Sequence, residues 1–427
     1  MSLPWRPLLA GEAAARALAA AGDIAAVTAR GVSFYPRNLR PEGVPVWENA
    51  LSSGRVGQCL LHAYLALHGA GAGDAHADVA IDLLDQATEA AAGLRLGTSL
   101  YLGFPGIAWT AAHLAGRLFA DEEDGNREVD EVLLRSLSRS PWEGAYDLFT
   151  GLVGLGVYAL ERLPRPAAAQ CLEAVVAQLA RRAERHPEGA AFFSPVGDLP
   201  PQFRGELPQG AYVLGMGQGV AGVIALLGAA CQAGVAAPAA RSLLAATVSW
   251  LLARERPPES GYRFPQFHFS GAAARESPLA WRVGDLGIAA SLLLAARGAG
   301  EPAWEAAGRR VALAAAARHP DLAGGAGAGL SDGPAGIGHV FNRLYQATGE
   351  TALAEAARRW LDQALAQRTP GVGIAGFRIT YRGEWLDEPG FARGATGIGL
   401  ALLAAVSQVD PAWDRALLLS TLPIPLS

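Results

Sequence analysis

Residues 214–227 read LGMGQGVAGVIALL, a glycine-rich turn followed by an apolar run, and this stretch decides the fold. Gly219 and Gly222 form a G-x-x-G pair, and almost every residue after the pair is apolar. A helix that is apolar on all sides has to be buried. The stretch therefore predicts a buried helix that begins at a glycine turn.

The same G-x-x-G pattern occurs seven times along the 427 residues, each time before an apolar run. The pairs are Gly54/Gly57, Gly103/Gly106, Gly151/Gly154, Gly219/Gly222, Gly284/Gly287, Gly333/Gly336 and Gly394/Gly397. Their spacing of about 48 to 68 residues is typical of an array of helical pairs. We expect the first glycine to end a loop and the second to let two inner helices approach closely.

Amphipathic segments lie between the apolar runs, for example residues 173–185 and 355–365, and they predict outer helices that face water. Strand signals are nearly absent beyond short pieces such as residues 377–382. The last apolar run, residues 397–403, is no more polar than the middle ones, whereas an open solenoid needs polar terminal repeats. The sequence therefore predicts an all-α fold, an α/α toroid of seven helical hairpins that forms a single domain over residues 1–427.

Three connections between an outer and the next inner helix are long and rich in proline or aromatic residues. They run from Pro187 to Met216, from Pro257 to Trp281 and from Thr369 to Arg393. Long loops often carry function, so we expect these three to form the walls of a central cavity.

The composition excludes several classes of function. The chain has no lysine, which rules out a Schiff-base lysine and a P-loop of the G-x-x-x-x-G-K type. The net charge of −5 and the scattered arginines argue against a nucleic-acid partner. The three cysteines, Cys59, Cys171 and Cys231, lie far apart and form no C-x-x-C pair, as expected in a reducing cytoplasm. No signal peptide and no membrane span are readable, so a cytoplasmic location is predicted.

At the turns before the inner helices the sequence resembles the lanthionine synthetase C-like family. The resemblance rests on residues 214–227, on AWRVGDLGIA at 280–289 and on LSDGPAGIGHVFNRLY at 330–345, and it extends over essentially the whole chain. It implies a seven-fold α/α toroid that holds a zinc ion with two cysteines and one histidine. It also implies addition of a peptide cysteine thiol to dehydroalanine or dehydrobutyrine, which forms a thioether ring.

The zinc motif is where the chain departs from this family. The family's first zinc cysteine is replaced by Arg282, and its cysteine-histidine pair is replaced by Ser331 and Asp332. The proton-transfer histidine implied by the resemblance is Gln218, and the acidic residue before the last G-x-x-G is Arg393. Because zinc prefers thiolate and imidazole donors, we predict that no zinc and no other cofactor is bound.

The candidate catalytic residues are Asp147, which matches the family's cavity aspartate, together with Arg282, Asp332 and Arg393. The candidate substrate-binding residues are Gln218, Ser331 and Asp285. We expect an Arg282–Asp332 ion pair, with Arg393 a candidate third member, to fill the volume and charge of the zinc site. The alternatives are structural: each aspartate can cap a helix or pair with an arginine, and Arg282 can form a structural salt bridge.

Two functions are consistent with these observations. In the first, the protein binds a dehydrated precursor peptide and promotes zinc-independent cyclisation, with an arginine stabilising the enolate that forms. In the second, it is a catalytically degenerate member that binds a peptide or acts as a scaffold subunit of a modification complex. The expected partners are a modified precursor peptide and a dehydratase or another modification enzyme.

Overall fold

The computed structural model describes residues 4–33, 43–69, 73–120, 124–269, 276–318, 327–381 and 384–420. The chain divides into two compact units. Unit 1 comprises Met1–Asn126 and Ala323–Trp413, and unit 2 comprises Arg127–Leu322 and Asp414–Ser427. The single domain predicted over residues 1–427 stays a prediction.

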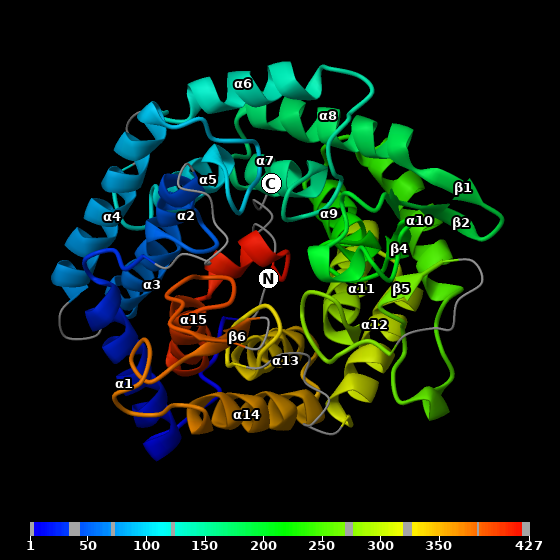
Figure 1. Cartoon of the computed structure of the whole chain (residues 1–427). Helices are drawn as coiled ribbons and strands as arrows, with labels where there is room; N and C mark the ends of the chain where they lie inside the picture. Colours follow the sequence, from blue (N-terminus) through cyan, green and yellow to red (C-terminus); the bar gives the residue numbers. More distant parts are fainter. Residues whose placement is uncertain are drawn as a thin grey trace. The chain divides into compact units, whose positions relative to one another are not determined.

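Seven helices begin directly after the first glycine of a G-x-x-G pair, as the sequence predicts. They are α3 (Arg55–His68), α5 (Phe104–Leu114), α7 (Leu152–Glu161), α9 (Val220–Gln232), α11 (Asp285–Ala299), α13 (Pro334–Thr348) and α15 (Ala395–Val406). In α9 every residue from Val220 to Ala230 is buried. These are the inner helices (Figure 1).

The first glycine of each pair ends a loop, as predicted, whereas the second is needed for a reason that differs from the predicted one. In all seven repeats, a Cβ on the first glycine would lie within 3.0 Å of the carbonyl oxygen six residues earlier, because the loop folds back over the start of its own helix. At the second glycine, Gly287 for example, a Cβ would collide with the oxygen of Trp281 and also meet Met216 Cβ of the preceding repeat at 2.8 Å. The second glycine therefore accommodates loops rather than a second inner helix.

The outer helices are amphipathic. They are α4 (Gly73–Gly93), α6 (Arg127–Leu137), α8 (Pro166–Arg182), α10 (Ala237–Leu252), α12 (Pro302–Ala316) and α14 (Thr351–Ala366). All of them except α6 pack on an inner helix of their own unit, whereas α6 packs mainly on α8. Segments 173–185 and 355–365, predicted as outer helices, fall largely in α8 and α14.

The last inner helix, α15, obtains its outer partner from the other end of the sequence. Helix α1 (Gly11–Thr28) packs against α15 in unit 1 (Figure 1). The indole nitrogen of Trp5 donates to the oxygen of Ala404 at 2.9 Å, and the backbone nitrogen of Leu8 donates to Ala405 at 2.8 Å. The seventh pair is thus not a hairpin of consecutive helices, which the sequence pattern alone does not reveal.

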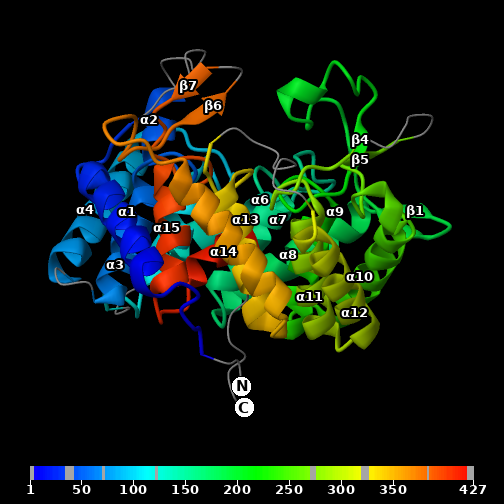
Figure 2. The ribbon, with the colours of Figure 1, turned by 90° about the horizontal axis from the view of Figure 1, so that it is seen from below.

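Strands occur in and next to the long connections, and all of them are short. In unit 2, β1 (Glu184–His186) pairs with β2 (Gly189–Ala191), and β3 (Phe193–Ser194), β4 (Ala211–Val213) and β5 (Phe267–His268) form an antiparallel sheet. In unit 1, β6 (Ile379–Tyr381) pairs with β7 (Glu384–Leu386) at the end of the unit where α2 (Val44–Asn49) lies (Figure 2). Residues 270–275 and 382–383 of the connections lie outside the described residues.

Buried ion pairs stabilise unit 2, and two of them involve the end of α7. Arg162 of α7's C-terminal end contacts Asp130 of α6 at 2.6 Å, and both side chains are almost fully buried. Arg415 of the short 3-10 helix Ala412–Leu417 contacts Glu161 at 3.0 Å. Removing one partner of such a pair leaves an uncompensated buried charge, so these contacts hold α6 and the 3-10 helix in place.

Candidate functional site

The loops that precede the inner helices are joined by backbone hydrogen bonds within each unit. In unit 1, Ser331 donates to Ala392 at 2.9 Å, Ala392 to Ser52 at 3.0 Å, and Ser52 to Tyr101 at 3.0 Å. In unit 2, Gly217 donates to Arg282 at 3.0 Å. Each of these residues lies two positions before the first glycine of its repeat. The bonds place equivalent positions of neighbouring loops side by side, at the starts of the inner helices.

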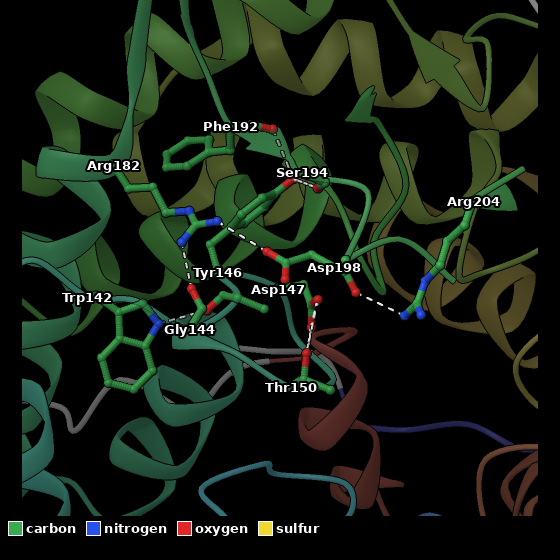
Figure 3. Close-up of polar contacts among 12 residues, drawn as sticks. Trp142, Gly144, Tyr146, Asp147, Thr150, Arg182, Phe192, Ser194, Asp198 and Arg204 are labelled. Carbon is green, nitrogen blue, oxygen red and sulfur yellow. Dashed lines mark hydrogen bonds and ion pairs between the residues drawn. The ribbon is translucent and has the colours of Figure 1, made fainter. Parts of the chain in front are cut away.

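Asp147 lies in the loop before α7, four residues before Gly151 (Figure 3). Its side chain is 5% exposed. The backbone nitrogen of Thr150 donates to Oδ1 at 2.7 Å, and the Thr150 hydroxyl lies 3.2 and 3.3 Å from the two carboxylate oxygens. Burial raises the pKa of Asp147 to about 6, although the hydrogen bonds from Thr150 oppose the shift. Asp147 is therefore a carboxyl group that changes its charge close to neutral pH.

A second carboxylate, Asp198, adds to the raised pKa of Asp147 by charge repulsion. Arg182 of α8 holds Asp198 at 3.3 Å, donates to the oxygen of Gly144, and lies over the Tyr146 ring at 5.5 Å (Figure 3). The Tyr146 hydroxyl in turn donates to the oxygen of Phe192 at 3.1 Å. Arg182 thus fixes the long connection that carries Asp198 to the loop that carries Asp147. No repeat motif in the sequence marks Asp198 or Arg182.

Arg282 and Gln218, two of the predicted site residues, contact each other in unit 2. Arg282 Nη1 donates to Gln218 Oε1 at 3.1 Å. A Cβ on Gly217 would lie 2.6 Å from Arg282 Cγ and 2.7 Å from the Phe149 ring, so both side chains lie directly over Gly217. Because Phe149 belongs to the Asp147–Thr150 turn, the turn and the arginine converge on one glycine. Phe149 lies two residues before Gly151, as Arg282 lies two residues before Gly284. This shared repeat position is the sequence signal that could have identified Phe149 as a site residue.

Ser331, Asp332 and Arg393 lie in unit 1. The Ser331 hydroxyl donates to the oxygen of Ala392 at 2.9 Å, and Arg393 Nη2 lies 3.3 Å from the oxygen of Thr380 in β6. The N-cap residue of α13 is Gly333, directly after Asp332. Since Arg282 and Asp332 belong to different units, the ion pair predicted between them stays a prediction, and so do the catalytic roles of Asp332 and Arg393.

Asp285, predicted to bind substrate, occupies a structural position. It is the first residue of α11 and is fully buried. Its carboxylate accepts from the backbone nitrogens of Arg263 at 3.0 Å and Phe264 at 2.9 Å, and Arg318 lies 3.4 Å away. These contacts attach the connection before α11 to the helix. The role of Asp285 in substrate binding stays a prediction.

Glu388 is a buried carboxyl group that the sequence reading missed. It lies in unit 1, six residues before Gly394, and is 7% exposed. Burial raises its pKa to about 7, against the opposing effect of the Arg393 charge. Asp147 in unit 2 and Glu388 in unit 1 are thus buried carboxyl groups, each in the loop before an inner helix, with a pKa near neutral.

The residues at the zinc positions do not fit a zinc ion. A guanidinium, a hydroxyl and one carboxylate, from Arg282, Ser331 and Asp332, are not a set of thiolate and imidazole donors, and a guanidinium repels a cation. Within the described ranges, no three histidine, cysteine, aspartate or glutamate side chains are grouped as metal ligands.

The arrangement of helices and turns defines the class of protein. The chain aligns structurally with nisin cyclase over 88% of its own length and 93% of that chain, with a TM-score of 0.72 and 18% sequence identity. This likeness confirms the predicted all-α toroid fold. The family model of lanthionine synthetase C-like proteins matches residues 45–418, and the chain therefore belongs to this family. No curated protein matches the sequence significantly. No helix of the described segments is both long and apolar enough to cross a bilayer.

Proposed function

We propose that the protein binds a dehydrated precursor peptide and promotes addition of a cysteine thiol to a dehydroamino acid without zinc. The proposal is carried by one observation: a buried carboxyl group, Asp147, with a pKa of about 6, stands in the loop at the start of an inner helix of a lanthionine synthetase C-like chain. Groups of this kind are typical of general acid/base sites.

Asp147 accepts the proton of the thiol in this proposal. A cysteine thiol has a pKa of ~8.5, so an ordinary aspartate of pKa 3.8 is a poor base for it. Raising the aspartate pKa to about 6 narrows the pKa difference between thiol and aspartate by about two units, which lowers the free-energy cost of the proton transfer by roughly 3 kcal/mol. At pH 7 most Asp147 is still the carboxylate that the base has to be. Burial therefore gives a stronger base that remains deprotonated at neutral pH.

Arg282 stabilises the negative charge that forms on the peptide. The thiolate forms a bond to Cβ of the dehydroamino acid, the double-bond electrons move to the carbonyl oxygen as an enolate, and Cα then takes a proton. Arg282 is a fixed cation oriented by its 3.1 Å contact with Gln218. A pre-oriented cation at a developing oxyanion lowers the barrier without a Lewis-acidic metal.

The alternative is a catalytically degenerate subunit that only holds a peptide or a modification enzyme. It is favoured by the simultaneous replacement of the family's zinc ligands and proton-transfer histidine, at Arg282, Ser331, Asp332 and Gln218. In this alternative Asp147 and Arg282 serve the structure alone, as organiser of the Thr150 turn and as partner of Gln218.

The experiment uses a peptide with one dehydroalanine and one cysteine, and follows loss of free thiol by alkylation and mass spectrometry. We expect the protein to exceed the uncatalysed rate, and Asp147→Asn and Arg282→Ala each to slow the reaction by about 100-fold or more. Arg297→Ala, an exposed arginine on α11, is the matched control. Peptide binding without acceleration favours the scaffold function, and absence of both binding and acceleration refutes both functions.

A further inference from the structure

The hairpin of β6 and β7 is attached to the loops in which α13 and α15 begin (Figure 2). Ile379 of β6 forms an antiparallel bridge with Gly327, in the loop before α13. In the loop before α15, Arg393 Nη2 lies 3.3 Å from the oxygen of Thr380. The hairpin therefore has a fixed place in unit 1 beside the loops that carry Ser331 and Arg393.

The backbone of Trp385 in β7 points away from β6. Tyr381 and Glu384 are paired and only two residues apart from each other in the turn, so this pair exchanges backbone hydrogen bonds. Pairs with and without such bonds alternate along an antiparallel ladder. Thr380 and Trp385, the next pair, therefore exchange none, and the contact of the Thr380 oxygen with Arg393 agrees with this. The N–H and C=O of Trp385 thus face the outer edge of β7.

This outer edge has no partner among the residues that the structure describes. β6 and β7 form a sheet of two strands, and no group in the described ranges bonds to the outward N–H or C=O of Trp385. The outward groups of an edge strand can pair with the backbone of another extended chain. β7 therefore offers one donor and one acceptor to an added strand.

The indole of Trp385 is an exposed apolar surface next to the same edge. The residue is 58% exposed, more than any other large hydrophobic residue in the described segments. Successive side chains lie on opposite faces of a strand, so Trp385 and Thr380 share one face and the buried Ile379 lies on the other. The hairpin packs on unit 1 through Ile379, which leaves Trp385 available to another molecule.

The size of the edge indicates which molecule pairs with it. A second copy of the chain would meet β7 through its own three-residue strand, and two indoles bury roughly 300–500 Å² between them. A specific dimer needs about 1,000 Å² or more. A long peptide needs no such area at β7, because it also reaches the loops that carry Ser331 and Arg393, where a second contact holds it.

We propose that β7 binds the dehydrated precursor peptide in extended form as an added strand, with an apolar side chain of the peptide on Trp385. This inference rests on the proposed function, in which such a peptide is bound. Backbone pairing at Trp385 tolerates many peptide sequences, and the indole selects which residue of the peptide is held there. The hairpin thus orients the peptide beside Arg393.

The first test measures binding of the dehydroalanine peptide by fluorescence anisotropy, with its cysteine replaced by serine so that no ring forms. Trp385→Ser should raise Kd about tenfold, and Trp385→Phe should restore most of the affinity. Leu313→Ser, at an exposed apolar residue of α12, is the matched control and should change nothing. Thermal unfolding establishes that each variant is folded.

The second test examines the peptide backbone and the reaction. Methylation of one backbone nitrogen of the peptide should raise Kd about tenfold, and methylation of either neighbouring nitrogen should not, because neighbouring N–H groups face opposite edges of a strand. In the addition reaction with the cysteine peptide, Trp385→Ser should raise KM about tenfold and leave kcat unchanged, since Trp385 contacts no reacting atom.

A folded Trp385→Ser protein with the wild-type Kd, or a peptide in which no methylated position matters, overturns this inference and leaves the proposed function standing. A dimer that Trp385→Ser abolishes in sedimentation, with unchanged peptide affinity, overturns it in favour of a second copy. Wild-type protein that binds the peptide through Trp385 without accelerating the addition supports this inference and overturns the cyclisation. Wild-type protein that binds no peptide overturns both.

Discussion

Replacing the buried carboxyl group of Asp147 by an amide should change how the folding stability of the protein depends on pH. Burial raises the pKa of Asp147 from 3.8 to about 6. The folded protein therefore binds the Asp147 proton more tightly than the unfolded chain does. The stability that this proton contributes is fully present below pH 3.8, declines as the pH rises, and is lost above pH 6.

The size of the effect follows from the shift. Two pKa units correspond to about 3 kcal/mol of unfolding free energy, of which about 2 kcal/mol falls between pH 4 and pH 7. The amide side chain of the Asp147→Asn variant carries no titrating proton, so the stability of the variant lacks this component.

The measurement is urea unfolding, followed by tryptophan fluorescence, of wild type and Asp147→Asn between pH 4 and pH 8. The variant should gain about 2 kcal/mol relative to wild type as the pH rises from 4 to 7. Loss of the Thr150 hydroxyl contact shifts the difference by a constant and does not affect its slope. Asp362→Asn, whose side chain is 72% exposed, is the control and should show no such slope. A difference between wild type and Asp147→Asn that does not vary with pH refutes the reasoning.

Three further outcomes are expected. Gly287→Ala should lower the free energy of unfolding by about 2 kcal/mol or more, because its Cβ would collide with the oxygen of Trp281. Gly22→Ala, in open space on α1, should instead raise the free energy of unfolding by about 0.5–1 kcal/mol. Equal melting temperatures of the two variants would contradict this. Arg162→Ala should lower the free energy of unfolding, measured in urea, by about 3–5 kcal/mol, because Asp130 is left as a buried unpaired charge. The double variant Asp130→Leu, Arg162→Met should recover part of this loss. A loss below about 1 kcal/mol in Arg162→Ala would disprove a stabilising role for the pair. Elemental analysis of the purified protein should find far less than one zinc per chain, and about one equivalent bound at the inner-helix starts would disprove the predicted zinc-free site.

The sequence predicts the starts of the inner helices because the information is local. Each G-x-x-G pair stands directly before an apolar run, and the structure begins a helix at every one of them. The reason for the glycines is not local. It depends on the carbonyl oxygen six residues earlier, such as that of Trp281 at Gly287, which approaches only when the loop has folded back.

The candidate site is predicted only in part, because the repeat pattern marks only the residues directly before each glycine pair. That pattern identifies Arg282 and Gln218, which the structure brings together. It misses Glu388, whose carboxyl group reaches two residues along its loop to Gly390. It also misses Asp198, which comes from a long connection with no repeat register and approaches Asp147 through Arg182.

The pairing of α1 with α15 has a consequence for biosynthesis. The hydrogen bond from Trp5 to Ala404 joins residues 399 positions apart. A ribosome that adds about 5–20 residues per second needs on the order of 20–80 s to make that length of chain. During this time the apolar face of α1, including Ala17 and Ile24, lacks α15, the helix against which it mainly packs. The nascent chain is therefore expected to depend on a chaperone until α15 emerges. A truncated protein that ends before residue 395 should aggregate rather than form a stable fragment.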